Sequence, residues 1–366
     1  MKPDKTSINL CLYYVAIFFL AYVLAVYPFH LWDNIPEKYI DVTSTYDFSF
    51  GDFSIRRVLG INNGVYLALQ NEENGEISIY NLKESEGAEE IFSFQPSCKR
   101  CLGIEYSAKK NIFLIYSSDD FRGQILEAVS FSGEKIWEYS FWGGMYSMTF
   151  HSPDGNQIFL NTERNGHSSK AVILDLNGMI ISENKFEYPN FQVIGETADG
   201  FVLGVEQNGG IIMKVSRNFD VIWRQNIPKY YNFASSFYND KIYTTKGFLD
   251  KRSMIIYDGN TGKIEKKIHI GKLPAVAAKL RAPVVADDGD IFVLYHGYYG
   301  NEAITSGVLK IDSQGKSFVI VPDCEKTVPN ALLYSNETVF VSSSQRANGF
   351  LEKVFVCRID KDETLE

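Results

Sequence analysis

Histidine side chains are the groups in this chain that could act as nucleophiles, acids or bases near neutral pH. His151 stands directly before a Ser-Pro-Asp-Gly turn, whereas His167, His269 and His296 are scattered, with no two at ligand spacing on one strand. A metal site built from histidines therefore has no support. A single histidine beside a turn is more often a structural hydrogen-bonding group, so we predict no catalytic residue. If the protein is an enzyme instead, His151 and His296 are the candidates.

The sequence Cys98-Lys-Arg-Cys101 could serve three kinds of chemistry. Haem attachment would require a histidine at the next position, but Leu102 is there. A structural zinc ion would require two more ligands, and outside the apolar residues 8–29 the only other cysteines are Cys324 and Cys357, far away in sequence. A short local disulfide between Cys98 and Cys101 fits an exported protein, and it is the pairing we predict. We predict neither a metal nor a cofactor.

A third set of residues combines aromatic rings with basic groups in the longer connections between expected strands. Aromatic and arginine side chains are enriched at recognition surfaces, so these residues are our candidates for binding a ligand or partner. The alternative is that a given ring only packs between neighbouring sheets. The set comprises Lys99, Arg100, Trp142, Tyr146, Tyr188, Lys229, Tyr230, Tyr231, Lys272 and Arg281.

The element that would position these residues is a repeat. A turn followed by an apolar strand recurs seven times at intervals of 41 to 48 residues, and solenoids of helices are excluded because no copy has helical periodicity. Typical copies are SPDGNQIFL (152–160), TADGFVLGV (197–205) and ADDGDIFVLY (286–295). The turns are marked by Asn63, Lys109, Asp154, Asp199, Asp240, Asp288 and Asn336.

A second tight turn recurs in phase with the first, marked by Gly133, Gly178, Asp220, Gly262 and Gly315. Each period therefore holds four short strands, which is the pattern of a β-propeller blade. We predict an all-β fold: a seven-bladed β-propeller of four-stranded antiparallel blades over residues 43–366. Because all blades share one channel, this is one domain.

The ring must also close. The last copy ends in VFVCRIDKDETLE (354–366), which supplies a third strand and little after it. The segment TSTYDFSF (43–50) has strand composition but no repeat of its own, so we predict that it is the closing outer strand of the last blade. This pairing would protect edges that are otherwise open.

The amino terminus differs from the repeats. Residues 8–29 contain no charged side chain and would span about 33 Å as a helix, enough for a hydrocarbon core. Lys2 and Lys5 precede them, so we predict a cytoplasmic stub (1–7), a transmembrane signal-anchor (8–29), a linker (30–42) and an extracytoplasmic propeller, periplasmic or at the cell surface. A cleaved signal peptide is the alternative, since Val23-Leu24-Ala25 offers small residues at suitable spacing.

Copies such as SFSGEKIWEYSF and IIYDGNTGKIEKKIHIG resemble the repeats of the quinoprotein-like (PQQ-type) propeller superfamily. The resemblance implies a docking tryptophan in the outer strand, which Trp137 and Trp223 match, whereas Ser182 and Lys266 stand at equivalent positions. Quinone-dependent dehydrogenases of this superfamily use an adjacent cysteine pair, which this chain lacks. Propeller-type aryl sulfotransferases use a channel histidine, but the spacing around His151 differs from theirs.

We therefore expect a membrane-tethered, extracytoplasmic binding or assembly scaffold that binds its ligand or partner at the channel-mouth face. The partner would be an envelope protein or a glycan. Nucleic acid is excluded because the formal net charge is -9 and no basic stripe exists to neutralise phosphates. The alternative is an exported enzyme of the aryl sulfotransferase or lyase type that works in the channel mouth.

Overall fold

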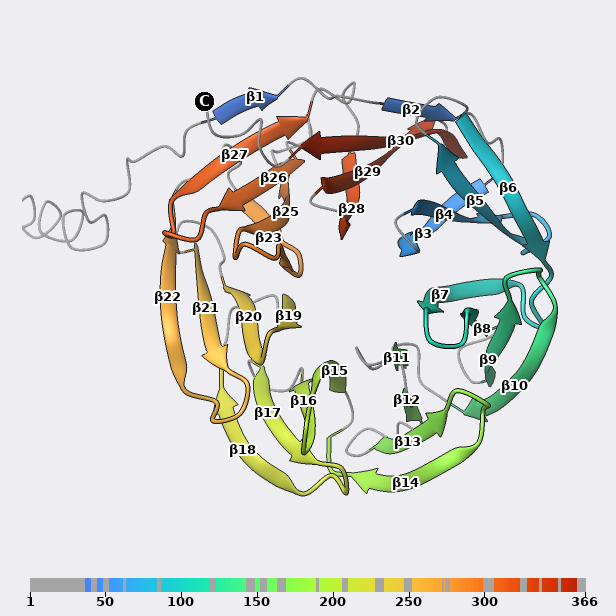
Figure 1. The fold of residues 1–366 in the computed structure, drawn as a ribbon, viewed down its shortest axis with the longest axis horizontal. Coiled ribbons are helices and arrows are strands. Elements are labelled where there is room, and N and C mark those ends of the chain that lie inside the picture. The colour runs from blue at the N-terminus through green and yellow to red at the C-terminus, as the bar shows by residue number, and fades with distance from the viewer. Residues whose placement is uncertain are drawn as a thin grey trace, which may run out of the picture.

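The repeats form separate sheets around a ring. The computed structural model describes residues 37–40, 45–48, 53–61, 64–83, 87–118, 123–142, 149–151, 157–162, 169–188, 191–205, 210–227, 234–246, 252–271, 273, 277–298, 306–322, 328–335, 338–347 and 350–360. These residues form seven sheets that follow one another along the chain (Figure 1). In the sheets of consecutive strands, the first strand lies nearest the centre of the ring and the last lies at the outer rim, whereas β1 and β2 are added at the outside of their sheets (Figure 1).

Four sheets are made of consecutive strands from the first two thirds of the chain. The first contains β3 (Phe53–Ile61), β4 (Gly64–Asn71), β5 (Ile77–Lys83) and β6 (Gly87–Phe94). The second contains β7 (Arg100–Ser107), β8 (Ile112–Ser118), β9 (Gly123–Ser130) and β10 (Lys135–Trp142). The third contains β11 (Thr149–His151), β12 (Gln157–Thr162), β13 (Ser169–Asp175) and β14 (Ile180–Phe186). The fourth contains β15 (Phe191–Thr197), β16 (Gly200–Val205), β17 (Ile211–Ser216) and β18 (Val221–Asn226).

The other three sheets complete the ring. One contains β19 (Ala234–Tyr238), β20 (Lys241–Lys246), β21 (Arg252–Asp258) and β22 (Ile264–Ile270). The next contains β23 (Ala277–Leu280), β24 (Val284–Val285), β25 (Ile291–Tyr298), β26 (Ser306–Ile311), β27 (Ser317–Pro322) and, added at its edge, β1 (Glu37–Ile40). The last contains β28 (Val328–Ser335), β29 (Thr338–Ala347), β30 (Phe350–Asp360) and β2 (Thr45–Phe48).

This architecture corrects the predicted fold class. Six of the sheets are four-stranded, but the sheet of β23–β27 has six strands, and β1 pairs with β27 in parallel. An array of seven alike four-stranded antiparallel blades is therefore wrong. The repeat analysis missed β1 because four residues outside the repeats carry no periodic signal, and these residues had been placed in the linker.

The predicted helix over residues 8–29 lies outside the described residues. In the part of the chain that the structure describes, no helix has the length and apolar character needed to cross a membrane.

The chain end and the chain start meet in the last sheet. β2 pairs with β30 in antiparallel register, with Thr45 opposite Cys357 and Phe48 opposite Val354. Residues within the segment predicted to close the ring therefore form its outer strand, beside the strand where the prediction placed them. Because β2 precedes all the other strands of this sheet, the sheet forms only when both ends of the chain come together.

Hydrophobic cores lie between neighbouring sheets. One cluster joins Leu59 and Ile79 of the first sheet to Ile104 and Phe113 of the second. Another joins residues of β20–β22 to residues of β25–β27. The β7–β10 sheet has such a core on each side, which explains why β8 (Ile112–Ser118) is buried along its whole length.

The tight turns before the outer strands share one hydrogen-bond pattern in four sheets, and a fifth sheet has a version that is one residue longer. In the first of them, the amide of Ser130 donates to the carbonyl of Glu134, and the Ser130 hydroxyl accepts from two amides within the turn. In all five turns, the residue before the last one of the turn has a positive φ, which glycine adopts without steric cost. This position is occupied by Gly133, Gly178, Phe219, Gly262 and Gly315.

Two of these glycines also receive a tryptophan from the preceding sheet. A Cβ atom at Gly178 would lie 2.7 Å from the ring of Trp137, and one at Gly262 would lie 2.6 Å from the ring of Trp223. The Trp137 indole nitrogen donates to the carbonyl of Leu176 at 3.0 Å. Trp137 and Trp223 thus dock where the resemblance to quinoprotein-like repeats implies.

The β15–β18 sheet reverses this pairing. The outer strand before it carries Ser182 where Trp137 and Trp223 stand, and its turn carries Phe219, with φ of 66°, where the others carry glycine. The Phe219 ring packs 5.7 Å from Phe159 and 6.0 Å from Phe186, both in the preceding sheet. The aromatic ring between the sheets therefore comes from the turn instead of the outer strand.

We expect Phe219→Gly to destabilise the protein by about 2–4 kcal/mol in urea unfolding. The loss of a buried ring costs about 3–5 kcal/mol, and the relieved backbone strain returns about 1 kcal/mol. The double variant Ser182→Trp with Phe219→Gly rebuilds the pairing of Trp137 with Gly178 and should recover part of the loss. An unfolding midpoint unchanged in Phe219→Gly would contradict this explanation.

Candidate interaction surface

The predicted binding residues are only partly described. Lys99 and Arg100 are exposed at the start of β7, Arg281 is exposed before β24, and Tyr188 is half-buried after β14. Trp142 is the last residue of β10. The other predicted binding residues lie outside the described residues: Tyr146, Lys229, Tyr230, Tyr231 and Lys272.

The two histidines of the enzyme alternative lie in different sheets. His151 ends β11, opposite Ile158 of β12. His296 lies in β25, between Lys279 of β23 and Ser306 of β26. The structure does not bring them together in one strand pair.

Tyr188 holds neighbouring sheets together. Its carbonyl accepts a hydrogen bond from the Ser169 hydroxyl at 2.7 Å, and its hydroxyl accepts one from the Arg224 guanidinium at 3.1 Å. Its ring packs on Phe186 with centroids 5.1 Å apart. Arg224 belongs to β18 in the next sheet. The contacts of Tyr188 therefore agree with the alternative interpretation, in which an aromatic residue of a long connection packs between neighbouring sheets.

The junction that contains Lys99 and Arg100 is fixed by a buried glutamine. The Gln70 side chain donates to the carbonyls of Lys99 at 2.6 Å and Gly75 at 3.1 Å, and it accepts from the amide of Cys101 at 3.2 Å. A polar residue near the end of the second strand makes a similar bond in two other sheets. Asn161 donates to the carbonyl of Phe191, and Thr245 donates to that of Arg281.

These bonds were not predicted, although the signal was present. Polar residues at the end of an otherwise apolar second strand, at corresponding places in the repeat, mark a position that must satisfy backbone groups of the next sheet. Because buried backbone carbonyls need partners, removing such a side chain is costly. The main chain behind Lys99 and Arg281 is thereby held in place, while both side chains remain exposed.

Cys98 and Cys101 are both buried, and the structure forms no disulfide between them. The Cys101 thiol lies 3.5 Å from the carbonyl of Gly103, with geometry suited to donation. The predicted local bridge is therefore not formed in this structure. In the described part of the chain, no group of three or more histidine, cysteine, aspartate or glutamate side chains could hold a metal ion.

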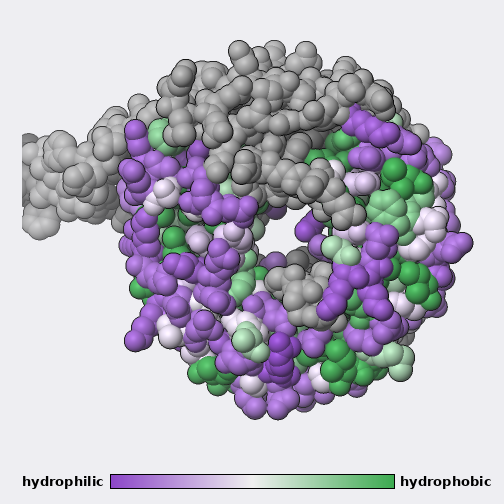
Figure 2. All heavy atoms as spheres, viewed as in Figure 1, coloured by the Kyte–Doolittle hydropathy of each residue, from purple (hydrophilic) through white to green (hydrophobic). Residues whose placement is uncertain are grey.

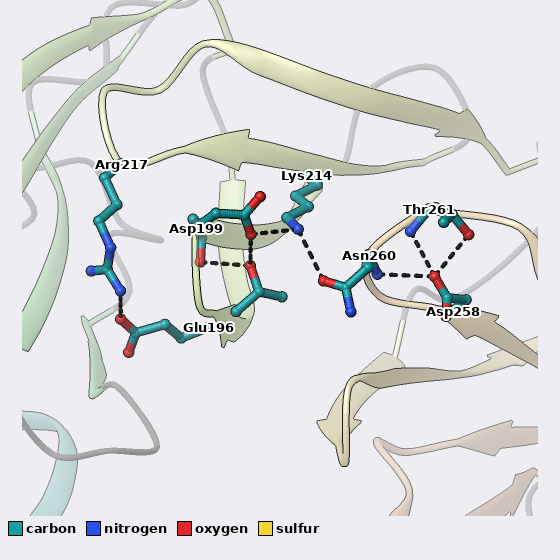
Figure 3. A network of polar contacts seen from close by, with 9 residues as sticks. Glu196, Asp199, Lys214, Arg217, Asp258, Asn260 and Thr261 are labelled. Atoms are coloured by element: carbon teal, nitrogen blue, oxygen red, sulfur yellow. Dashed lines mark hydrogen bonds and ion pairs between the residues drawn. The ribbon is translucent and has the colours of Figure 1, made fainter.

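A polar network joins the β15–β18 sheet to the β19–β22 sheet on the tight-turn side (Figure 3). Lys214 is buried and its ammonium group bonds to Asp199 at 2.6 Å and to the Asn260 side chain of the next sheet at 3.1 Å. The Lys214 hydrogen bond holds the pKa of Asp199 below its usual value. Lys214 and Asp199 are therefore paired with each other, and the bond from Lys214 to Asn260 connects the two neighbouring sheets.

A second polar contact spans two innermost strands. Arg57 of β3 and Glu105 of β7 form an ion pair at 3.1 Å, and both side chains are partly exposed. Burial raises the pKa of Glu105, and the Arg57 guanidinium opposes this increase. Figure 2 shows an opening through the centre of the ring, around which the innermost strands lie (Figure 1). This opposite-charge pair links two neighbouring sheets.

Exposed aliphatic side chains gather at the outer rim. Among the described residues, seven of the eight large exposed hydrophobic residues follow the second tight turn in four consecutive sheets, at or beside the start of β10, β14, β18 and β22. Their exposed fractions range from 48 % to 67 %. Figure 2 shows hydrophobic clusters at the rim, separated by hydrophilic side chains. We call these residues the aliphatic rim: Ile136, Met179, Ile180, Ile181, Val221, Ile222 and Ile264.

Single exposed hydrophobic residues are common on protein surfaces and need no explanation. The aliphatic rim differs because its members recur at corresponding positions of the repeat, one to three residues after the positive-φ residue of the turn. The sequence shows this pattern as Lys-Ile-Trp, Met-Ile-Ile, Val-Ile-Trp and Lys-Ile-Glu. We did not predict it, because the repeat pattern does not show which apolar residues of an outer strand are exposed.

Comparison with known structures identifies the fold as a β-propeller. The chain is similar to BamB from Moraxella catarrhalis, with 14% identity over 87% of this chain and 99% of that one, and a TM-score of 0.53. It is similar to the C-terminal WD40 domain of Sif2, with 10% identity over 88% and 99% and a TM-score of 0.52. A prolyl endopeptidase structure matches with 10% identity and a TM-score of 0.58 over 85% of this chain but 51% of that chain.

No family model and no curated protein matches the chain. At 10% to 14% identity, the similar structures show the fold alone. The class is thus a β-propeller, a fold consistent with a binding or assembly scaffold. The assignment of its repeats to the quinoprotein-like type stays a prediction.

Proposed function

We propose that the protein is a membrane-tethered, extracytoplasmic propeller that acts as a binding or assembly scaffold for another envelope protein. The observation that supports this most is the aliphatic rim, because aliphatic side chains half or more exposed in four consecutive sheets form a surface suited to a protein partner. A glycan partner would instead favour exposed aromatic rings and hydrogen-bonding groups. The tether rests on the uncharged residues 8–29 and the basic residues before them.

The contacts on the described parts of the two faces also favour a scaffold over an enzyme. The Gln70 and Tyr188 side chains and the Lys214 network bond across neighbouring sheets and rigidify the ring. A rigid ring presents a partner-binding surface without an ordering cost at the moment of binding. The exposed Lys99, Arg100 and Arg281 side chains remain predicted contacts at the channel mouth.

Affinity purification from detergent-solubilised membranes tests the proposal. The wild-type protein should retain at least one envelope protein in a stoichiometric complex, and the variant Ile180→Asp with Ile181→Asp should lose about 90 % of it, equivalent to tenfold weaker binding. Both substitutions are at exposed positions, so the melting temperature should change little.

Leu102→Asp is the matched control. Leu102 is also an exposed hydrophobic residue, but it lies on β7, next to the channel instead of the rim. This variant should retain the complex at the wild-type level. If the wild-type protein purifies alone, or if the rim variant keeps its partner in full, the proposal is wrong.

A further inference from the structure

The outer edge of one sheet already carries an added strand. β1 pairs in parallel with β27, from Glu37 opposite Val319 to Ile40 opposite Pro322, and lies outside it at the rim (Figure 1). Ser317 and Phe318 of β27 occupy the repeat positions of the aliphatic rim, yet they are half-buried, whereas Ile180 and Ile181 are exposed. The rim of this propeller can therefore take an additional strand, which in this sheet pairs with the four residues that directly follow Ser317 and Phe318.

The neighbouring outer strand, β22, has an open edge among the described residues. It is the last strand of the order β19-β20-β21-β22, and no described strand pairs with its other side. An unpaired strand edge presents amide and carbonyl groups to any extended chain that approaches it. The first four residues of β22 are all exposed, and its last three alternate between buried and exposed.

The charge along this edge is positive, in a chain whose formal net charge is -9. Lys263, Lys266 and Lys267 are exposed, and none of the three forms an ion pair within the described part of the chain. The Lys266 ammonium group bonds to the neutral carbonyl of Ser313 at 3.2 Å. Glu265 is the one acidic residue of the strand, and it is paired with Lys241 at 2.8 Å. Three positive charges on this edge therefore have no acidic partner among the described residues.

Apolar surface lies in the same place. Ile264 is 60 % exposed at the start of β22, and Val221 and Ile222 begin β18, the outer strand of the preceding sheet. Aliphatic contacts beside lysine ammonium groups suit an extended segment that alternates acidic and aliphatic residues, because successive side chains of a strand point to opposite faces.

We propose that β22 is a docking edge for an extended acidic segment of the partner protein, which adds to it as a further parallel strand, as β1 adds to β27. This inference rests on the scaffold function proposed above and specifies the chemistry of the partner. Backbone hydrogen bonds give such an interface its affinity, and the lysines and Ile264 select the sequence. Because β22 and β27 both follow the second tight turn of their sheets, the added strand runs in the same sense in both.

Two labelled peptides serve as probes in fluorescence anisotropy: acetyl-Glu-Val-Glu-Ile-Glu-Val-Glu-amide and its counterpart with lysine in place of glutamate. The acidic peptide should bind the full-length protein at least about tenfold more tightly than the basic one, since charge complementarity decides between them. Amide hydrogen exchange in β22 should slow when the acidic peptide binds. If the rate of amide hydrogen exchange in β22 does not change, the acidic peptide is held by electrostatic attraction alone, and strand addition is wrong.

The β22 variant carries Lys263→Glu, Lys266→Glu and Lys267→Glu, and its affinity for the acidic peptide should fall about tenfold or more. A control variant changes the net charge equally at exposed lysines elsewhere, through Lys109→Glu, Lys110→Glu and Lys185→Glu. The control should keep its affinity within about twofold. Equal losses in both variants would overturn the inference, because only the overall charge would then matter.

Two further outcomes separate this inference from the proposed function. If the wild-type protein retains an envelope protein and the β22 variant retains it equally, the docking edge is wrong while the scaffold function stands. If the wild-type protein retains no partner, the scaffold function itself fails. Binding to vesicles that contain phosphatidylserine, without binding of the acidic peptide, would assign the basic edge to a lipid surface and overturn the inference.

Discussion

Deleting residues 43–50 will lower the melting temperature of the protein by about 10 °C or more, the largest effect we expect from any short deletion. This segment contains β2, which pairs with β30 and joins the start of the chain to its end. Without it, β30 becomes an open edge. The sequence also predicts apolar contacts from Tyr46, Phe48 and Phe50, and each large side chain, when well buried, contributes about 1.5–3 kcal/mol. Their combined loss would approach the free energy of unfolding of a typical domain, which is roughly 5–15 kcal/mol.

Thermal unfolding followed by circular dichroism measures this effect, and deletion of residues 31–42 is the control. The control removes β1, which covers four residues at the outside of a sheet that keeps β23–β27. It should therefore lower the melting temperature by only a few degrees, on the order of 1 kcal/mol in stability. If the two deletions have equal effects, closure through β2 does not determine the stability of the ring.

Replacing Asp290 by alanine will destabilise the protein by about 3–5 kcal/mol, because it leaves a buried ammonium group without its counter-ion. Lys310 is 2 % exposed and lies 2.8 Å from the Asp290 carboxylate, with its charge 5.7 Å above the Phe292 ring. The same carboxylate accepts a hydrogen bond from the amide of Ser313 at 3.2 Å. One substitution therefore removes the partner of a cation and of a backbone amide.

The control for this prediction is Glu265→Ala, which breaks the more exposed ion pair with Lys241 and should cost about 0–1 kcal/mol. The double variant Asp290→Ala with Lys310→Met removes both charges and should be more stable than Asp290→Ala alone. Chemical unfolding in guanidinium chloride measures all three. A double variant less stable than the single one would show that the lysine charge is not what makes Asp290 necessary.

The repeat itself was predictable, because each copy carries a turn signal and apolar strands at a nearly constant interval. Closure through residues 43–50 was also predictable, since the last copy lacks an outer strand. The parallel strand β1 was not, because four residues outside the repeat have no periodic neighbour to compare with. Phe219 was missed because a turn position usually filled by glycine can hold an aromatic residue when the packing compensates for the strain.

The candidate surface could be predicted less well than the fold. Tyr188 was selected as an aromatic residue in a long connection, yet its carbonyl is bonded within its own sheet and its hydroxyl is bonded to Arg224 of the next sheet. Composition alone cannot distinguish an aromatic side chain that is available to bind a partner protein from one that already packs within the propeller. The aliphatic rim was visible in the sequence after each second turn, but its significance depends on exposure. Exposure follows from how far the outer strands extend beyond the neighbouring sheets, which a repeat pattern does not show.

The parallel orientation of β1 determines how the ring responds to mechanical force from its amino-terminal side. A pull on the chain before Glu37 acts along the axis of β1, so the bonds between β1 and β27 are loaded together in shear instead of opening one at a time. With an anchor at residues 8–29, tension from the membrane reaches β27 first. It reaches the closing pair of β2 and β30 only after β1 has detached. Under such tension, the short strand β1 would therefore detach from β27 before the ring opens.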